Sequence, residues 1–404
     1  MSARWRDGNH VELLENGEAF YPRLYAAIDA ARREVLLETF ILRDDKVGQA
    51  LQKTLIAAAQ RGVRVEVTVD AWGSMGLTPE FIQDLTTAGV GFRLFGTTQP
   101  RWLLRLAWFR RLHRKIVVVD GEVAFVGGIN FCADHLADFG PEAKQDYAAE
   151  VTGPVVADIH GFVLDAIGST HRKRWWRRAA GRASEPEPLP STGAMTVMFV
   201  TRDNRRHRTA IERHYRAAIA TSKQRLVIAN AYFFPGYRLL RDIRNAARRG
   251  VDVRLLMQGE PDMLVARLGA RMLYDYLLRA GVRIYEYCER PFHGKVALTD
   301  DTWATVGSSN LDPLSLSFNL EANVAVRSTQ LNVEVYRRLE RLMNDHCTEI
   351  DPASASRRVF WRPIASFFVF HFLRRFPRWV THLPAQQTQL TSVPPPRRNG
   401  RESP

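Results

Sequence analysis

Two kinds of apolar periodicity, helical and strand-like, follow one another along this chain, and their order occurs twice. Residues 26–40 (AAIDAARREVLLETF) and 217–233 (AAIATSKQRLVIANAYF) each have the pattern of an amphipathic helix that runs into an apolar strand. Two further pairs of helix-then-strand segments, each with a glycine near the helix end, are 55–70 with 243–258 and 85–95 with 277–287. Strands that alternate with helices predict an α/β fold, and the duplication predicts two similar lobes.

We expect each lobe to be a mixed, mostly parallel sheet flanked by helices, with pseudo-twofold symmetry and the active site between the lobes. A stretch rich in Pro, Ser and Gly separates the two halves, and the C-terminus is polar and Pro-rich. The expected divisions are a first lobe (1–180), a linker (181–194), a second lobe (195–350), a basic and aromatic segment (351–384) and a disordered tail (385–404).

Polar residues interrupt one strand pattern in each half, in HRKIVVVD (113–120) and HGKVALTD (293–300). The repeated residues are His113, Lys115, Asp120, Gly127 and Asn130 in the first copy, and His293, Lys295, Asp300, Gly307 and Asn310 in the second. Because side chains alternate along a strand, the His and Lys of each copy share one face, whereas the Asp lies on the other and is read as structural. Lysine is rarely buried without a partner, so an anion between the copies is expected.

The two copies differ in length just before the motif histidine. There are 24 residues from Gly89 to His113, but only 12 from Gly281 to His293. The extra dozen residues fall within 96–111, which is aromatic, leucine-rich and strongly basic. This insertion predicts an element that faces the substrate or a membrane.

Composition narrows the function classes without choosing one. With 404 residues, 46% hydrophobic and 25% charged, the chain has the composition of a globular protein with room for two domains. Its net charge of +14 favours an anionic partner, which could be a lipid head group, nucleic acid or a phosphorylated substrate. Its cysteines are Cys132, Cys288 and Cys347, and their spacing predicts neither a disulfide framework nor a zinc site.

Three stretches combine basic and aromatic residues, and these are 101–115, 171–178 and 357–384. The last has six Arg and no acidic residue around IASFFVFHFL, a run of ten residues that is too short to span a bilayer but suited to its interface. We expect this segment to attach to an anionic membrane surface, whereas 171–178 has the pattern of a solvated basic helix. No signal peptide and no spanning run of roughly 20 apolar residues is found, so a cytoplasmic chain is expected.

The paired motifs resemble the signature of the phospholipase D superfamily, in which His-x-Lys is followed by Asp and then by Gly-Gly-x-Asn or Gly-Ser-x-Asn. Longer strings resemble the bacterial cardiolipin synthases within it: LLENGEAFYPRLYAAI, GPEAKQDYA and GSSNLDPLSLSFNLEANV. The resemblance covers nearly the whole chain. It implies a phosphatidyl transferase that joins two phospholipid-derived units through a phosphohistidine, with no metal or other cofactor.

The resemblance also implies roles for individual residues. One motif histidine attacks phosphorus while the other exchanges protons with the alcohols, and family precedent gives attack to His113 and acid–base work to His293. The residues implied to hold phosphate oxygens are Lys115, Lys295, Asn130, Asn310 and Ser308. Gly128 stands where the second copy has Ser308, so a backbone N–H is the only donor expected there.

Later acidic residues, Asp146 and Glu321, match those with which the superfamily orients its histidines. Matched strand ends that should face the cleft supply the pocket candidates Glu38, Tyr232 and Phe233.

The implied partners are phospholipids at an anionic membrane surface. Phosphatidylglycerol would be one substrate, with a second phospholipid such as phosphatidylethanolamine, or glycerol, as the other, and the protein would lie peripherally on the cytoplasmic face of the bacterial cell membrane. Two alternatives are a superfamily phosphodiesterase or nuclease and a noncatalytic membrane-binding scaffold. Intact motifs disfavour the scaffold, and clustered Trp, Phe and Arg suit lipid better than nucleic acid. The oligomeric state is open.

Overall fold

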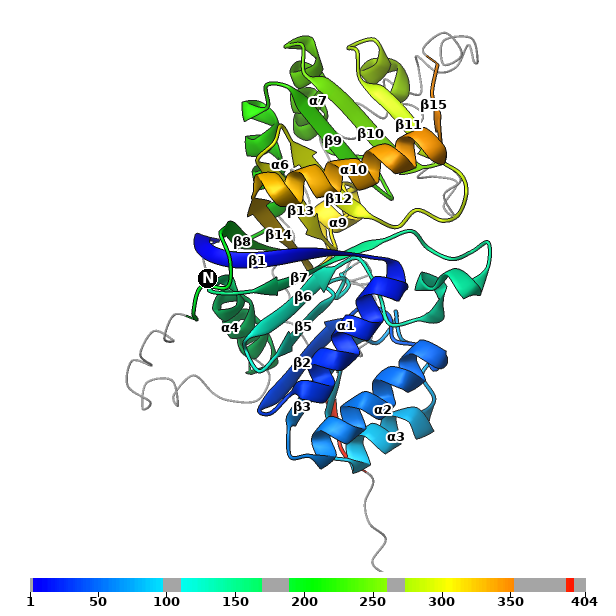
Figure 1. Cartoon of the computed structure of the whole chain (residues 1–404). Coiled ribbons are helices and arrows are strands. Elements are labelled where there is room, and N and C mark those ends of the chain that lie inside the picture. The colour runs from blue at the N-terminus through cyan, green and yellow to red at the C-terminus, as the bar shows by residue number, and fades with distance from the viewer. Residues whose placement is uncertain (1–2, 97–109, 169–188, 260–272, 352–389, 396–404) are drawn as a thin grey trace, which may run out of the picture.

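A computed structural model of the chain describes residues 3–96, 110–168, 189–259, 273–351 and 390–395. Within these residues, 16 strands form one continuous mixed sheet that runs through both lobes, with helices packed against it (Figure 1). Among the described residues, no helix is both long enough and apolar enough to cross a membrane.

The first lobe contains eight of the strands. Its strands are β1 (Trp5–Glu15), β2 (Glu34–Thr39), β3 (Arg64–Asp70), β4 (Gly91–Phe95), β5 (Ile116–Val119), β6 (Val123–Gly127), β7 (Tyr147–Thr152) and β16 (Leu390–Val393). Its helices are α1 (Asn16–Ala30), α2 (Lys46–Gln60), α3 (Pro79–Thr87) and α4 (Val155–Gly168), with short 3-10 turns η2 (Ala133–His135) and η3 (Ala137–Phe139).

The second lobe repeats this plan. Its strands are β8 (Met195–Arg202), β9 (Arg225–Asn230), β10 (Asp252–Gln258), β11 (Arg283–Tyr287), β12 (Lys295–Thr299), β13 (Trp303–Gly307), β14 (Glu321–Arg327) and β15 (Cys347–Glu349). Its helices include α6 (Ala210–Thr221), α7 (Tyr237–Arg248), α9 (Pro313–Ser317) and α10 (Thr329–Asp345).

The two lobes have the same strand order, which confirms the duplication. From its inner edge the first lobe runs β1-β7-β6-β5-β2-β3-β4-β16, and the second runs β8-β14-β13-β12-β9-β10-β11-β15. Antiparallel pairing of β1 with β8 joins the two halves into one sheet. Because equivalent strands meet at this seam, the lobes are related by an approximate twofold arrangement, as expected from the repeat.

Three apolar clusters hold the helices on the sheet. One lies under α1, α2 and α3, a second lies under α6 and α7, and a third combines residues of both lobes with α4 and α10. In the third, Val156 of α4 and Val335 of α10 are fully buried. Burial on both faces explains why β5 (IVVV) and β12 (KVALT) are apolar runs without alternation, apart from the lysine that opens β12.

The expectation of a mostly parallel sheet is wrong, because antiparallel strand pairs predominate. Among the described strands, only β2 with β3, β3 with β4, β9 with β10, and β10 with β11 pair in parallel. The motif strands β5, β6 and β7 instead form a meander, as do β12, β13 and β14. At the β5–β6 turn, Asp120 and Gly121 have φ values of 54° and 69°, and such a tight left-handed turn reverses the chain.

The tail expectation is also wrong in part. Leu390–Val393 pairs antiparallel with β4. It thereby covers an edge strand whose backbone N–H and C=O groups would otherwise lack partners. The stretch 171–178, the segment 357–384 and residues 97–109 of the insertion lie outside the described residues.

Candidate active site

The His-Lys segments of both lobes are largely buried, and each begins where the chain contacts the opposite lobe. His113 precedes β5, and Lys295 is the first residue of β12. Each lysine donates its ammonium to the backbone carbonyl of the histidine two residues earlier, from Lys115 Nζ to His113 O at 2.9 Å and likewise from Lys295 to His293. Each lysine is therefore held against the backbone of the histidine in its own copy.

Each motif histidine is paired with an acid from the other lobe. His113 Nδ1 lies 3.1 Å from Glu321 Oε2, and His293 Nδ1 lies 2.6 Å from Asp146 Oδ2. All four side chains are largely buried. The sequence match identified both acids as candidates for orienting a histidine, but only the structure shows that the pairs cross between lobes.

Backbone hydrogen bonds between the lobes hold each histidine next to the acid of the other lobe. The His113 N–H donates to the Leu320 carbonyl at 3.0 Å, and the His293 N–H donates to the Gln145 carbonyl at 2.8 Å. Since Leu320 and Gln145 directly precede the two acids, each acid is delivered to the opposite histidine by a short inter-lobe bridge. The site is thus assembled only when the two lobes pack together.

Burial and positive charge shift the titration of these groups. Burial lowers the pKa of His113, with Glu321 opposing the shift, and it lowers the pKa of His293 well below its usual value, with Lys295 adding to the effect. Burial also lowers the pKa of Lys115 to about 7 and that of Lys295 to about 8. An anion placed among these groups would favour their charged forms, as is needed to hold a phosphate.

The two acids respond differently to their surroundings. Burial raises the pKa of Asp146, although Lys295 acts to lower it. Burial also acts to raise the pKa of Glu321, but the neighbouring His113 and the hydroxyl of Ser308 outweigh it, so that this pKa lies below its usual value. The two halves of the site are therefore similar in geometry but unequal in electrostatics.

Ser308 has a different contact from the one expected. Its hydroxyl donates to Glu321 Oε2 and accepts from the Ala322 N–H at 3.1 Å, so its proton holds the orienting acid instead of facing a phosphate. A Cβ at Gly128 would lie 2.3 Å from Asp146 Oδ1, which excludes a serine there. The Gly128 N–H donates to the Tyr147 carbonyl at 2.9 Å, so the expected backbone substitute for the hydroxyl is wrong.

The two motif asparagines are buried and also differ from each other. Asn130 Oδ1 accepts the backbone N–H of Ile41 at 3.2 Å, which ties the loop after β6 to the end of β2. Asn310 Oδ1 is buried and has no hydrogen-bond partner. A buried polar oxygen without a partner is unusual, and it leaves the Asn310 amide as a group that a substrate could satisfy.

Asp120 and Asp300 lie directly after the motif strands, and their carboxylates accept hydrogen bonds from backbone N–H groups. Asp120 accepts the N–H groups of residues 32–34, and Asp300 accepts those of residues 223–225. Both have left-handed φ values, of 54° and 49°. They were grouped with the catalytic candidates through the motif, but these contacts bear out the structural reading from strand alternation.

The three pocket candidates have separate surroundings. Glu38 is buried against Arg114, with Oε2 2.9 Å from Nε, and the Arg114 guanidinium lies 4.7 Å from the centre of the Phe162 ring. Phe233 belongs to the apolar core of the second lobe, and Tyr232 packs against the shared cluster. Repeat matching located strand ends but could not tell which side chains turn inward.

Aromatic neighbours of His113 were missed by the sequence analysis. The Phe40 ring centre lies 5.1 Å from that of His113 and 5.3 Å from Lys115 Nζ. Trp72 stacks on Phe40 at 6.2 Å and is 55% exposed. Phe40 follows directly on the matched strand β2, so its place at a strand end was the available signal.

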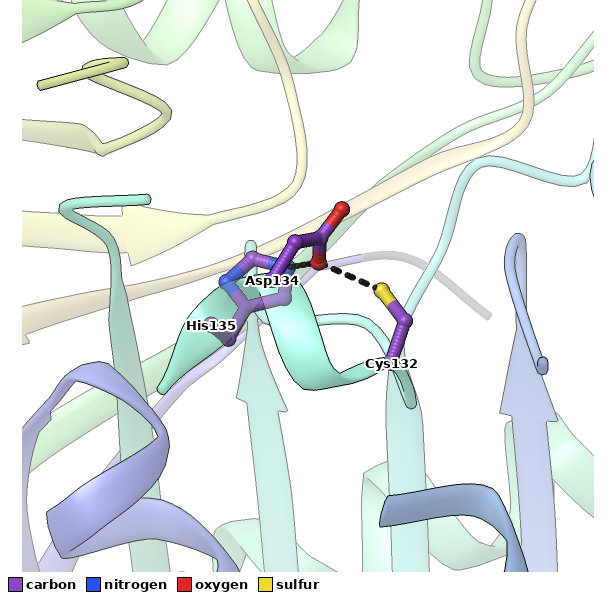
Figure 2. A group of neighbouring side chains, drawn as sticks. All are labelled: Cys132, Asp134 and His135. Atoms are coloured by element: carbon purple, nitrogen blue, oxygen red, sulfur yellow. Dashed lines mark hydrogen bonds and ion pairs between the residues drawn. The ribbon is translucent and has the colours of Figure 1, made fainter. Parts of the chain in front are cut away.

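A third histidine, His135, also lies buried at the site, and the sequence did not reveal it. Figure 2 shows it beside Cys132 and Asp134. Asp134 and His135 belong to η2, and Cys132 directly precedes it. The Cys132 thiol donates to Asp134 Oδ1 at 2.7 Å, and Lys144 donates to Asp134 Oδ2 at 2.7 Å. Although the three residues are close enough to bind a metal ion, the Asp134 carboxylate is already neutralised by the Lys144 ammonium and hydrogen-bonded to the Cys132 thiol.

Comparison with known proteins places these features in a family. The sequence pattern described as "Cardiolipin synthase, PLD-like domain" matches twice, at residues 24–157 and 215–343. The chain is 51% identical to cardiolipin synthase B of Salmonella typhi over 398 residues, covering 98% of this chain and 95% of that protein. It is 33% identical to cardiolipin synthase A of Pseudomonas fluorescens over 334 residues, covering 82% of this chain and 68% of that one.

The fold also resembles a solved structure. The phosphatidylserine synthase of Haemophilus influenzae superposes with a TM-score of 0.65 over 90% of this chain and 93% of that chain. The two sequences are 15% identical, so this likeness concerns the fold alone.

Proposed function

Because the chain belongs to the cardiolipin synthase family of phospholipase D-like proteins, we propose that it is a phosphatidyl transferase that forms cardiolipin. The observation that carries this proposal is the reciprocal pairing of two histidines with two acids across the lobes, with two buried lysines beside them. Phosphatidylglycerol is the proposed substrate, and the co-substrate is a second phospholipid, such as phosphatidylethanolamine, or glycerol.

In the first step, His113 Nε2 attacks the phosphodiester phosphorus. The Nδ1 side of this ring faces Glu321, so Nε2 is the nitrogen left for phosphorus. The N–P bond forms as the bond from phosphorus to the leaving alcohol breaks, and His293 donates a proton to the departing oxygen. Lys115 and Lys295 offset the charge on the nonbridging oxygens.

In the second step, the acceptor hydroxyl attacks phosphorus and the N–P bond breaks. His293 takes the hydroxyl proton, which returns both histidines to their starting states. The 2.6 Å contact from His293 to Asp146 supports the acid–base role, because a carboxylate fixes the tautomer and stabilises the imidazolium that forms.

The decisive assay incubates the pure protein with phosphatidylglycerol vesicles and follows the lipid products, with and without EDTA. Cardiolipin formation that survives EDTA and disappears in both His113→Ala and His293→Ala is the expected result. DNA cleavage without a lipid product would support a nuclease instead, and loss of activity on chelation would contradict the metal-free mechanism.

Trapping separates the roles of the two histidines. In His293→Ala, a phosphatidyl adduct should accumulate slowly on His113, whereas His113→Ala should form none. An adduct on His293 would reverse the assignment.

We further propose peripheral attachment to the cytoplasmic face of the cell membrane. The basic and aromatic segment 357–384 is the main candidate for this contact. Trp72 and Met75, in the loop after β3, are exposed large hydrophobic residues and add support, since Trp72 connects through Phe40 to His113. Flotation with anionic vesicles tests this, and undiminished binding of the chain truncated before Arg357 would contradict the role of the segment.

A further inference from the structure

The acid that faces each motif histidine has a different second neighbour in the two lobes. Glu321 Oε2 accepts the Ser308 hydroxyl in addition to facing His113. Asp146 cannot have the same neighbour, because Gly128 occupies the matching position and a Cβ there would collide with the carboxylate. In this half of the site, the side chain next to Asp146 is that of His135.

His135 is buried and oriented by a motif residue. Its Nε2 accepts the backbone N–H of Asn130 at 3.2 Å, so the ring proton of the neutral imidazole lies on Nδ1. Nδ1 is buried without a hydrogen-bond partner and lies 3.9 Å from Asp146 Oδ2. The ring also meets that of His293 edge to face, with centres 5.8 Å apart.

These contacts point the unsatisfied N–H of His135 at the same oxygen that faces His293. About 1 Å of approach converts the 3.9 Å separation into an ordinary hydrogen bond, since N–H···O bonds centre near 2.9 Å. A buried donor without a partner is costly, so formation of this hydrogen bond is favourable.

We propose that His135 is the positioning residue for Asp146 and supplies, in the first lobe, the second donor that Ser308 supplies in the second. This inference rests on the proposed function, in which His293 exchanges protons with the alcohols. A second N–H on Asp146 keeps the carboxylate ionised and aimed at His293 Nδ1 while that histidine gains and loses its proton.

A neutral donor suits this place better than a cation. Burial lowers the pKa of His135 to about 3, so the ring contributes a dipole without adding positive charge. The charged and titratable groups that act on Asp146 and His135 include Lys115, Lys144, Lys295, Asp134 and His293. Three of these five are lysines, so another cation would be repelled.

Two substitutions distinguish the contributions of the two ring nitrogens of His135. His135→Asn retains an N–H near the Nδ1 position, whereas His135→Gln retains an acceptor near Nε2 for the Asn130 N–H and loses the donor to Asp146. The Gln variant also keeps the contact that ties η2 to the motif loop, so it should fold. Thermal unfolding of both variants checks this.

Loss of the donor raises the pKa of Asp146, so the carboxylate becomes protonated at a higher pH. We expect His135→Gln to move the acid limb of the kcat profile upward by about one pH unit and to lower kcat near neutral pH by about tenfold, with KM unchanged. His135→Asn should stay within about twofold of the unchanged protein.

A measurement without substrate makes the result independent of the lipid reaction. In protein with 15N-labelled histidine, the titration of His293 should change in His135→Gln but not in His135→Asn. This shift would support the positioning role even if no cardiolipin were formed, in which case only the proposed function would fail. Equal kcat profiles and equal His293 titrations for the two variants would overturn the proposal.

Discussion

Removing the charge from Asp146 should reverse the tautomer of His293. Asp146 Oδ1 accepts the Tyr147 N–H at 2.8 Å, while Oδ2 faces His293 Nδ1 at 2.6 Å. In Asp146→Asn, the amide oxygen must stay at the Oδ1 position to accept that N–H, so the amide NH2 faces His293. The imidazole then accepts through Nδ1 and carries its proton on Nε2, where it cannot take one from an alcohol.

The equivalent change in the other half should leave the tautomer intact. Glu321 Oε2 faces both the Ser308 hydroxyl and His113 Nδ1, whereas Oε1 is buried without a hydrogen-bond partner. In Glu321→Gln, the amide oxygen at the Oε2 position still accepts from both groups, and the NH2 takes the Oε1 position. His113 therefore keeps its proton on Nδ1 and its nucleophilic nitrogen free.

The difference in rate follows from these two outcomes. A catalytic histidine held in the wrong tautomer loses on the order of 10³ to 10⁴ in kcat, or about 4 to 5.5 kcal/mol. Loss of a charge-assisted hydrogen bond costs about 1.5 to 3 kcal/mol, so Glu321→Gln should lower kcat about 10 to 100-fold. Initial rates of cardiolipin formation from phosphatidylglycerol vesicles measure both effects, with thermal unfolding as the folding control. Equal losses, or a larger loss in Glu321→Gln, would refute the tautomer argument.

Three further predictions follow from other parts of the structure. Asp120→Ala should lower the free energy of unfolding by about 1 to 3 kcal/mol in urea titrations and leave kcat of the folded protein unchanged, because the carboxylate binds only backbone N–H groups; a catalytic loss without destabilisation would contradict this. Sulfate should raise Tm more at about pH 6 than at about pH 9.5, since Lys115 and Lys295, with pKa values of about 7 and 8, are charged at the lower pH and lose their protons as pH rises; a sulfate effect that grows with pH would contradict it. Trp72→Ala should weaken activity on vesicles but spare activity on soluble short-chain phosphatidylglycerol, and equal losses on both would count against an interfacial role.

Much of the fold could be predicted from local patterns. Helix and strand periodicity, with glycines near helix ends, correctly predicted two matching α/β lobes. Strand alternation predicted that Asp120 lies apart from His113 and Lys115, and its carboxylate accepts backbone N–H groups of residues 32–34. Strand direction was predicted less well. Helix-linked strands do pair in parallel, but the tight turns of the motif meander made antiparallel pairs the majority.

The candidate site was predicted as a set of residues and not as a set of contacts. Asp146 and Glu321 were found by matching, but the hydroxyl of Ser308 was assigned to a phosphate, and Phe233 was assigned to a pocket. Hydrogen-bond partners depend on side chains that are distant along the chain, and so does the choice between core and cleft. Sequence spacing carries no information about either.

The sequence alone thus determined the duplication and the set of residue types that each motif carries, because these depend on local periodicity and on chemistry that a residue has wherever it lies. Only the tertiary structure decided that each histidine works with an acid of the opposite lobe. That pairing depends on the antiparallel seam between β1 and β8 and on the bridges that follow it, which bring together residues about 150 to 210 positions apart. The same packing placed His135 where Gly128 leaves no room for a hydroxyl.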